Sequence, residues 1–338
     1  MKNRIYIGIE RILSLAFFLI LIQACKQKVD STTSTAEKVQ ISNPVIKGYF
    51  ADPTMVKHNG KYYVYATIDP WGGDELAIFE SSDFINWEPK KINWPTLEAC
   101  QTTISTSSRV WAPCVIKGNN GKFYMYVSVG SEIWAGVSDA PLGPWKNAKA
   151  DNTPLIKGDM FPEYHMIDAE AFIDDDGQAY LYWGSGLNWK NGHCFIVPLN
   201  EDMISFDENA IKDITPPHYF EAPFMMKKNN KYYLMYSEGK CIDETYMVRY
   251  AVGDTPYGPW TEGVNDPILS TSKDTTTLGP GHHTVFTENN QDYILYHRIK
   301  DNNNTLLREI AIDSLNFDTE GNILKVIPKG GVTSFITN

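Results

Sequence analysis

The sequence predicts an all-β fold, a five-bladed β-propeller, and three observations support this prediction. The 338 residues include nineteen Tyr and nine Trp, residue types that are frequent in strands. No stretch of useful length shows the apolar spacing that is typical of an amphipathic helix. A polar turn followed by an aromatic-rich strand recurs five times. The copies are GKYYVYA (60–66), GKFYMYV (121–127), GQAYLYW (177–183), NKYYLMY (230–236) and QDYILYH (291–297).

The spacing of the five copies sets the size of the repeating unit. The second aromatic position of each copy is taken as its anchor, and successive anchors lie 53 to 61 residues apart. Hairpin units of this length match the four-stranded blades of a propeller. We therefore expect one domain over residues 45–338 and no second domain after it. A large β-sandwich with repetition by chance is the alternative. The anchors are Tyr63, Tyr124, Tyr180, Tyr233 and Tyr293.

Residues 1–24 are predicted to form a lipoprotein signal peptide. A basic start precedes an eleven-residue apolar run, 12–22, which is too short to span a membrane and suits a signal peptide. The following IQAC resembles a bacterial lipobox, in which Cys25 receives the lipid. We expect an exported protein that is lipid-anchored to a bacterial membrane, periplasmic or at the cell surface, with residues 25–44 as a flexible tether. One alternative is secretion without a lipid. The other is that the apolar run forms a buried segment of the core.

Charge and cysteine content argue against two other classes of function. The formal net charge is −11 and no basic stripe is present, so we expect no nucleic-acid partner. The cysteines after residue 25 form no C-x-x-C pair, so we expect no zinc site and favour buried free thiols over disulfides. They are Cys100, Cys114, Cys194 and Cys241.

Acidic residues occupy matching places in three of the five units. Because the first strand of each propeller blade lines the central axis, matching positions in different blades converge on one region. Carboxylates brought together in this way shift one another's pKa values, and paired carboxylates carry out glycoside hydrolysis. Strand capping or a structural cation is the alternative role. The residues that lie 11 or 12 positions before the anchors are Asp52, Ala112, Asp168, Glu221 and His282.

The motifs around these positions resemble those of glycoside hydrolase family 43. ADPTMVKHNGKYYVYAT, IDAEAFIDDDGQAYLYWG, EAPFMMKKNNKYYLMYS and GPGHHTVF carry the resemblance, which spans residues 48–327. It implies a five-bladed catalytic domain that hydrolyses arabinose- and xylose-containing polysaccharides with inversion at the anomeric carbon. It also implies that Asp52 of ADP is the general base and Glu221 of EAP the general acid. Asp168 of IDAEAF is then the acid that tunes the pKa and the orientation of Glu221.

The chemistry of inversion adds geometric expectations to these roles. Asp52 should be ionised and deprotonate a water, while Glu221 should be protonated and donate to the leaving oxygen. A water must fit between them, so we expect the two carboxyl groups about 6.5–9.5 Å apart. Asp168 should raise the pKa of Glu221 through its negative charge. Retaining fructan hydrolases instead carry RDP and EC motifs, which this chain lacks.

Four further residues are predicted to serve the site. Arg298 in YHRI resembles an arginine that binds the terminal sugar in relatives. Trp111 and Trp71 are expected to stack on the apolar faces of sugars. His282 in GPGHH matches a histidine that lies on the axis in many relatives, where it binds a structural Ca²⁺ through waters or simply holds the polar network. The reaction itself should require no cofactor.

The sequence therefore favours an inverting exo-glycoside hydrolase that releases a terminal pentose from plant polysaccharide. An α-L-arabinofuranosidase or a β-xylosidase is expected, with the first favoured. An endo-arabinanase or an exo-acting galactan hydrolase of the same family is the alternative, because a groove and a pocket can share the same acids. A non-catalytic glycan-binding lipoprotein is the alternative of another class. The presence of all three acids weighs against it.

Overall fold

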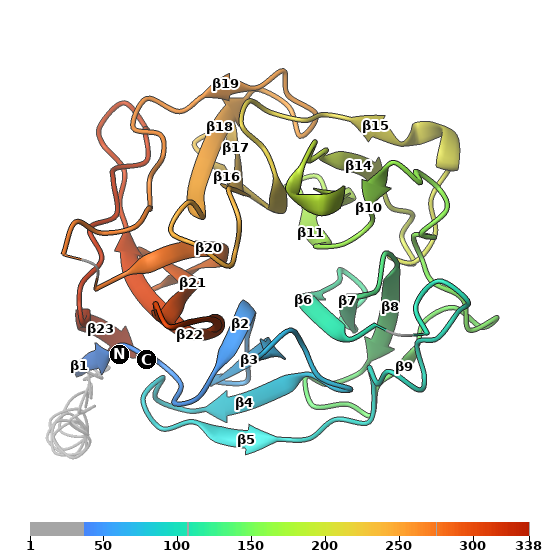
Figure 1. Cartoon of the computed structure of the whole chain (residues 1–338), viewed down its shortest axis with the longest axis horizontal. Coiled ribbons are helices and arrows are strands. Elements are labelled where there is room, and N and C mark those ends of the chain that lie inside the picture. Colours follow the sequence, from blue (N-terminus) through green and yellow to red (C-terminus); the bar gives the residue numbers. More distant parts are fainter. Residues whose placement is uncertain (1–36, 107, 275, 338) are drawn as a thin grey trace, which may run out of the picture. The chain divides into compact units, whose positions relative to one another are not determined.

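The computed structural model describes residues 37–106, 108–274 and 276–337. Five antiparallel sheets surround a central axis, as Figure 1 shows, so the predicted five-bladed β-propeller is confirmed. Helix is limited in the described residues to two short 3₁₀ turns, η1 (Leu187–Trp189) and η2 (Glu208–Ala210). None of the helices described is long and apolar enough to cross a membrane. The predicted signal peptide and Cys25 lie outside the described residues.

The chain builds the blades one after another, with the first strand of each blade nearest the axis. Blades 1 to 4 have four strands each, and the fifth sheet has three. The strands of blades 1 and 2 are β2 (Phe50–His58), β3 (Lys61–Ile68), β4 (Ala77–Ser81), β5 (Glu88–Lys90), β6 (Val110–Lys117), β7 (Phe123–Val129), β8 (Ile133–Ser138) and β9 (Lys146–Asn147).

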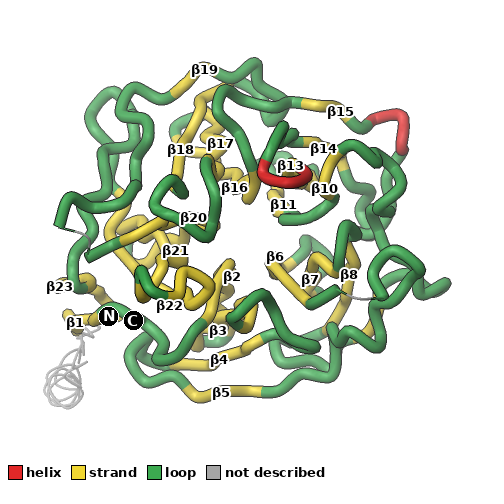
Figure 2. The backbone as a smooth tube through the Cα atoms, viewed as in Figure 1, coloured by secondary structure: helices red, strands yellow, loops and turns green. Residues whose placement is uncertain are grey.

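Blades 3 to 5 follow in the same order. Their strands are β11 (Glu170–Ile173), β12 (Ala179–Trp183), β14 (Phe195–Pro198), β15 (Lys212–Asp213), β16 (Glu221–Lys228), β17 (Lys231–Glu238), β18 (Met247–Gly253), β19 (Thr261–Glu262), β20 (Leu278–Glu288), β21 (Gln291–Asp301) and β22 (Asn304–Leu315). A small extra sheet pairs β10 (Tyr164–His165) with β13 (Ser185–Gly186). Figure 2 shows this sheet and η1 beside the centre of the propeller.

The recurring aromatic motif forms the second strand of every blade. Its residues are almost fully buried, because each second strand has a sheet packed against both of its faces. The turn before it is tight in blade 1, where Asn59 and Gly60 both have positive φ, as a two-residue type I′ hairpin requires. Asn229–Asn230 and Asn289–Asn290 repeat this conformation in blades 4 and 5.

Apolar side chains fill the spaces between neighbouring blades. Five core clusters occur among the described residues, and each combines side chains of two adjacent blades, such as Tyr65 of blade 1 with Met125 of blade 2. The four cysteines of the described chain are free and buried, as predicted. Burial of apolar area between blades therefore holds the ring together.

The two ends of the described chain close the ring. Strand β1 (Glu37–Ser42) pairs with β23 (Gly331–Thr337), and the Val45 amide donates to the carbonyl of Ile310 in β22. The predicted tether, residues 25–44, is therefore wrong over its last part. Ile41 is buried in the apolar cluster between blades 5 and 1, which fixes this segment to the domain.

Replacing Phe335 by Ala should destabilise the ring at this closure. The Phe335 ring is fully buried and lies 4.8 Å from the ring of Phe84 and 4.9 Å from that of Tyr293. Loss of such a core side chain should lower the free energy of unfolding by roughly 3–5 kcal/mol in urea titrations. Ile327→Ala, at an exposed position, is the control and should change it by less than about 0.5 kcal/mol. A similar small change for Phe335→Ala would show that β23 does not stabilise the propeller.

Candidate active site

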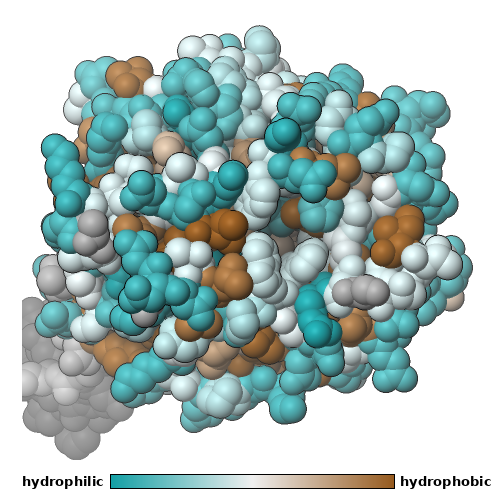
Figure 3. Space-filling view, in the orientation of Figure 1, coloured by the Kyte–Doolittle hydropathy of each residue, from teal (hydrophilic) through white to brown (hydrophobic). Residues whose placement is uncertain are grey.

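A cavity of about 280 Å³ lies at the propeller axis, where the face seen in Figure 3 is hollowed near its centre. Charged and aromatic side chains from all five blades meet in it. The ionisable ones are Asp52, Asp168, Glu221, His165, His282, Arg308 and Cys241. The aromatic ones are Trp71, Trp111, Trp189 and Phe220. The structure thus brings together the three predicted acids, the predicted axial histidine and both predicted tryptophans.

Each inner strand enters the site through one residue with left-handed backbone. These residues are Asp52, Ala112, Asp168, Ala222 and His282, with φ between 40° and 59°. In blades 1, 2, 4 and 5 the pairing with the second strand shifts at this point, which is the mark of a β-bulge. The bulge changes the local direction of the backbone, so that side chains at this point are directed toward the axis.

The matching position in blade 4 is Ala222 and not Glu221, which corrects the predicted register. The hairpin turn between the first two strands is one residue longer in blades 2 and 3 than in blades 1, 4 and 5. The position therefore lies 12 residues before the anchor in blades 2 and 3 but 11 before it in blade 4. Glu221 precedes the bulge residue, and so its carboxyl group approaches the cavity from a different angle than that of Asp52.

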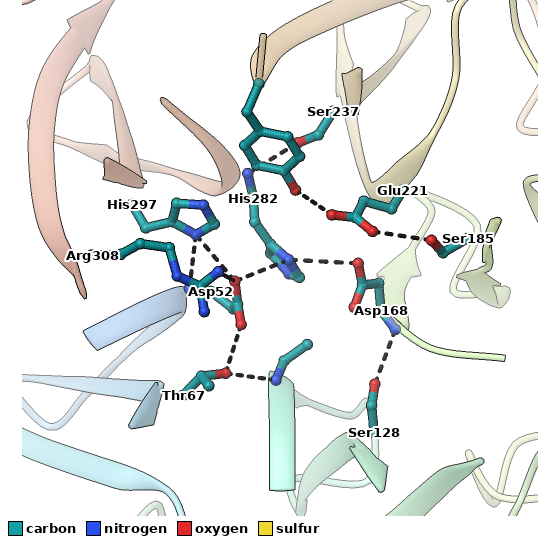
Figure 4. Close-up of polar contacts among 12 residues, drawn as sticks. Asp52, Thr67, Ser128, Asp168, Ser185, Glu221, Ser237, His282, His297 and Arg308 are labelled. Atoms are coloured by element: carbon teal, nitrogen blue, oxygen red, sulfur yellow. Dashed lines mark hydrogen bonds and ion pairs between the residues drawn. The ribbon is translucent and has the colours of Figure 1, made fainter. Parts of the chain in front are cut away.

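Hydrogen bonds between blades fix four of these five left-handed residues (Figure 4). In each case the amide of the left-handed residue donates to a side chain on the second strand of the preceding blade. The pairs are Ala112 with Thr67 at 2.9 Å, Asp168 with Ser128 at 3.0 Å, His282 with Ser237 at 3.0 Å and Asp52 with His297 at 3.3 Å. The backbone of each catalytic blade is therefore positioned by its neighbour.

The junction between blades 3 and 4 breaks this pattern. The matching second-strand position is Gly184, where a Cβ atom would lie 2.1 Å from the carbonyl oxygen of His193, so no side chain fits. The amide of Ala222 hydrogen-bonds the carboxyl group of Asp168 instead. Asp168 thereby holds the backbone directly beside Glu221.

Asp52 lies beside one buried cation, Arg308, and two histidines. Its carboxylate accepts a hydrogen bond from Thr67 at 2.7 Å and lies 3.4 Å from Arg308, 3.4 Å from His282 and 3.1 Å from His297. Burial alone would raise the pKa of Asp52, but Arg308 and the two histidines outweigh burial and hold the pKa well below its usual value. Asp52 is therefore ionised at neutral pH, as a general base must be.

Arg308, rather than the predicted Arg298, lines the cavity. Arg298 lies on β21 and its guanidinium binds Glu309, its cross-strand partner on β22, at 2.7 Å. Arg308 is buried and its guanidinium is clamped by Asp69 at 2.7 and 2.9 Å while reaching Asp52. The sequence could have indicated a role for Arg308, because an arginine inside the apolar run LLREIAI requires a partner or a function.

Glu221 lies in a less polar environment than Asp52. The hydroxyl of Tyr246 donates to one carboxyl oxygen at 2.8 Å and that of Ser185 to the other at 3.0 Å. Burial raises the pKa of Glu221 to about 7, against the effect of these two hydrogen bonds and with a contribution from the charge of Asp52. Burial, rather than Asp168 as predicted, is therefore the leading cause of the raised pKa.

Asp168 completes the group of acids. Its carboxyl group lies 3.6 Å from Nδ1 of His282, the same atom that contacts Asp52. Burial raises the pKa of Asp168 well above its usual value, and the charges of Glu221 and Asp52 raise it further. Repulsion between Asp168 and Glu221 acts on both, so this pair retains a proton near neutral pH while Asp52 stays ionised.

Aromatic rings form the entrance of the cavity. Nε1 of Trp111 donates to the carbonyl of Trp71 at 2.8 Å, and a Cβ atom on Gly72 would lie 2.3 Å from that nitrogen. Across the cavity, the rings of Trp189 and Phe220 stack with centroids 5.9 Å apart. Neither Trp189 nor Phe220 was predicted from the sequence, because both lie outside the repeated strands. Trp189 lies in η1, between β12 and β14 of blade 3, and Phe220 lies in the connection from β15 to β16.

Comparison with known proteins decides the family. The family model described as glycosyl hydrolases family 43 matches residues 41–323. The chain belongs to glycosyl hydrolase family 43. It is 32% identical to a β-D-galactofuranosidase of Aspergillus niger, over 93% of each chain. It is 28% identical to a xylosidase/arabinosidase of Bacteroides ovatus, over 82% of this chain and 95% of the relative.

Solved structures agree with this assignment. A thermostable family 43 glycoside hydrolase superposes with a TM-score of 0.70 at 29% identity, covering 85% of this chain and 96% of that structure. This family 43 protein is therefore a glycoside hydrolase that acts on O-glycosyl bonds, and the non-catalytic alternative is not supported.

The described residues offer the predicted calcium ion no set of direct ligands. Among the described residues, no group of three or more His, Cys, Asp or Glu side chains is arranged so that it could hold a metal ion. Nδ1 of His282 faces two carboxylates, and Arg308 already supplies positive charge beside Asp52. A hydrated ion held through water by His282 in this family 43 enzyme stays a prediction.

Removing one inter-blade hydrogen bond should destabilise the enzyme and impair the site. Ser128→Ala leaves the buried amide of Asp168 without its acceptor, so the free energy of unfolding should fall by about 1–3 kcal/mol. Urea titration measures the loss, and kcat should fall with it because Asp168 moves. Ser82→Ala, at an exposed position, is the matched control. If both variants unfold at the same urea concentration, the inter-blade bond has no role in stability.

Proposed function

We propose that this enzyme is an inverting exo-glycosidase that releases a terminal α-L-arabinofuranosyl residue from plant polysaccharide, with β-D-xylosides as the second substrate class. The observation that carries the proposal is the difference between the two carboxyl groups: Asp52 is held ionised, whereas burial raises the pKa of Glu221 to about 7. One base and one acid are the pair that inverting hydrolysis requires. A cavity of about 280 Å³ favours recognition of one terminal sugar.

The proposed reaction is a single displacement. Asp52 accepts a proton from a water whose oxygen forms a bond to the anomeric carbon, while the bond to the leaving oxygen breaks. Glu221 donates its proton to that leaving oxygen. Attack on the face opposite to the leaving group inverts the anomeric configuration. The expected separation of about 6.5–9.5 Å between the two carboxyl groups stays a prediction.

The neighbouring side chains support these roles. Arg308 and His282 stabilise the negative charge of Asp52. The negative charge of Glu221 raises the pKa of Asp168, and Asp168 accepts a hydrogen bond from the amide of Ala222, which holds the backbone next to Glu221. Trp71 and Trp111 are proposed to pack against the sugar at the entrance of the cavity.

A terminal β-D-galactofuranosyl residue is a third candidate substrate. The Aspergillus niger relative that is aligned over 93% of this chain is named for this activity. The furanose ring of this sugar has the same arrangement of hydroxyl groups as α-L-arabinofuranose and carries a longer exocyclic chain. An endo-arabinanase is the alternative within the family, and Bacillus subtilis has a relative of that name, 27% identical over 292 residues.

We also propose that the enzyme is exported and anchored to a bacterial membrane through lipid on Cys25. The support is the apolar run of residues 12–22 followed by IQAC. Metabolic labelling with a clickable fatty acid should mark the wild-type protein and not Cys25→Ser. Equal labelling of both, or of neither, would contradict the anchor.

A panel of substrates tests the proposed activity. We expect wild type to release arabinose from 4-nitrophenyl α-L-arabinofuranoside. The corresponding β-D-xyloside and β-D-galactofuranoside and linear arabinan are tested separately, because each represents one of the alternative activities. Glu221→Ala should reduce kcat on natural oligosaccharides by about 10²-fold or more, the contribution of a general acid. Proton NMR of the first product should show the inverted anomer. Release of internal fragments from arabinan would favour the endo-acting alternative.

The pH profile should report the acid and the base separately. Because Glu221 must be protonated, kcat/KM should fall as the pH rises through about 7, whereas the fall at acidic pH should lie far lower because the pKa of Asp52 is depressed. Tyr246→Phe removes a hydrogen bond that lowers the pKa of Glu221, so the alkaline limb should move to higher pH. Tyr257→Phe, outside the cavity, should leave it in place. A shift to lower pH in Tyr246→Phe would contradict the assignment of Glu221.

A further inference from the structure

The small sheet formed by β10 and β13 brings a polar side chain with no partner into the cavity. His165 is half-buried and lines the cavity wall. No hydrogen bond or ion pair joins its imidazole ring to another residue of the described chain, and burial alone lowers its pKa, to about 4. The ring is therefore a neutral imidazole at neutral pH, with one donor and one acceptor available to a ligand. By contrast, the three acids and Arg308 all have partners.

The strand pairing places His165 beside the general acid. His165 lies directly opposite Ser185 in the antiparallel pair of β10 and β13, so both side chains lie on the same face of this sheet. The hydroxyl of Ser185 donates to Glu221 at 3.0 Å. The small sheet thus contacts the proposed proton donor, Glu221, through Ser185 and carries the imidazole of His165 on the same face.

This wall lies away from the general base. Figure 4 shows Asp52 and Glu221 on opposite sides of His282, with Ser185 beyond Glu221. Figure 2 shows β13 and η1 across the axis from β2 and β22, the strands of Asp52 and Arg308. In an inverting reaction, the water attacks from the side of the base and the leaving group departs on the side of the acid. The wall beside Glu221 is therefore the side where the leaving group lies.

Other residues of this wall suit a sugar. The stacked rings of Trp189 and Phe220 offer an apolar surface on which a pyranose or furanose face can pack. Asn188, in the same 3₁₀ turn as Trp189, is exposed and lines the cavity with an amide group. An aromatic surface together with a few polar groups is the usual composition of a carbohydrate subsite.

We propose that His165, Asn188 and the Trp189–Phe220 pair form a binding site for the sugar residue on the leaving-group side of the cleaved bond, with His165 as its main specificity determinant. The site rests on the proposed function, because it assigns the second sugar of the same substrate. The enzyme then recognises a glycan leaving group in addition to the terminal sugar. The imidazole of His165 hydrogen-bonds a hydroxyl group of that second sugar.

Two substrates that differ in their leaving groups test the site. 4-Nitrophenyl α-L-arabinofuranoside carries no second sugar, whereas α-1,5-linked arabinotriose does. His165→Ala should lower the ratio of kcat/KM for arabinotriose to kcat/KM for the aryl glycoside about tenfold, the effect of one hydrogen bond. His165→Gln, which keeps a donor and an acceptor, should recover most of the ratio. The control is His218→Ala, an exposed histidine outside the cavity, which should leave the ratio unchanged.

Inhibition by the leaving group gives an independent measurement. Arabinobiose, the product on this side, should inhibit hydrolysis of the aryl glycoside about tenfold more weakly in His165→Ala, while inhibition by arabinose stays the same. Equal losses on both substrates, or an unchanged ratio, would overturn the assignment of His165. If wild type cleaves neither substrate, the proposed function itself fails and the site falls with it. Activity of His165→Ala on the aryl glycoside shows that the variant is folded.

Discussion

The geometry of this enzyme depends on hydrogen bonds that run from one blade to the next at the axis. An antiparallel blade satisfies its own backbone within its sheet, except at the bulge where the inner strand enters the cavity. There the free amide finds an acceptor on the neighbouring blade, Thr67, Ser128, Ser237 or His297. The position of each catalytic side chain is consequently set by two blades, and the site exists only when the ring is complete. Between blades 3 and 4 the second strand offers no such acceptor, and the carboxyl group of Asp168 accepts the hydrogen bond from the amide of Ala222 instead.

Buried acidic groups outnumber buried cations in and beside the cavity, and this imbalance determines which acid is ionised. Asp52, Asp69, Asp168 and Glu221 are four buried carboxyl groups, while Arg308 is the one arginine that reaches them within the described chain. Arg308 lies between Asp69 and Asp52, so its charge stabilises that side of the cavity and leaves Asp168 and Glu221 without a cation. Neutral histidines cannot compensate, because burial lowers the pKa of His282 and His297. The result is an ionised base on one side and, on the other side, two acids that together retain a proton near neutral pH.

The fold and the acids could be predicted from the sequence because a repeated pattern carries them. The aromatic second strand recurs in every blade, and counting back from its anchor reached Asp52, Asp168 and His282 correctly. The count failed by one residue at Glu221, because the hairpin turn of blade 4 is shorter than those of blades 2 and 3. Arg298 was predicted from its resemblance to a sugar-binding arginine, and the sequence does not show that its guanidinium binds Glu309, the residue paired with it on β22. Trp189, Phe220 and His165 lie outside the repeated strands, in η1, in the connection before β16 and in β10, where no repeat constrains the sequence.

The pairing of β1 with β23 also determines when the enzyme can acquire its structure. The partner of β1 is β23, the last of the described strands, so the ring cannot close until residues 331–337 have been synthesised. Four blades can be complete while Asp52 still lacks its partners Arg308 and His297, which both belong to the fifth. A nascent chain therefore carries its acids without the cation that separates their roles, and catalytic competence arises in one late step when the two ends meet.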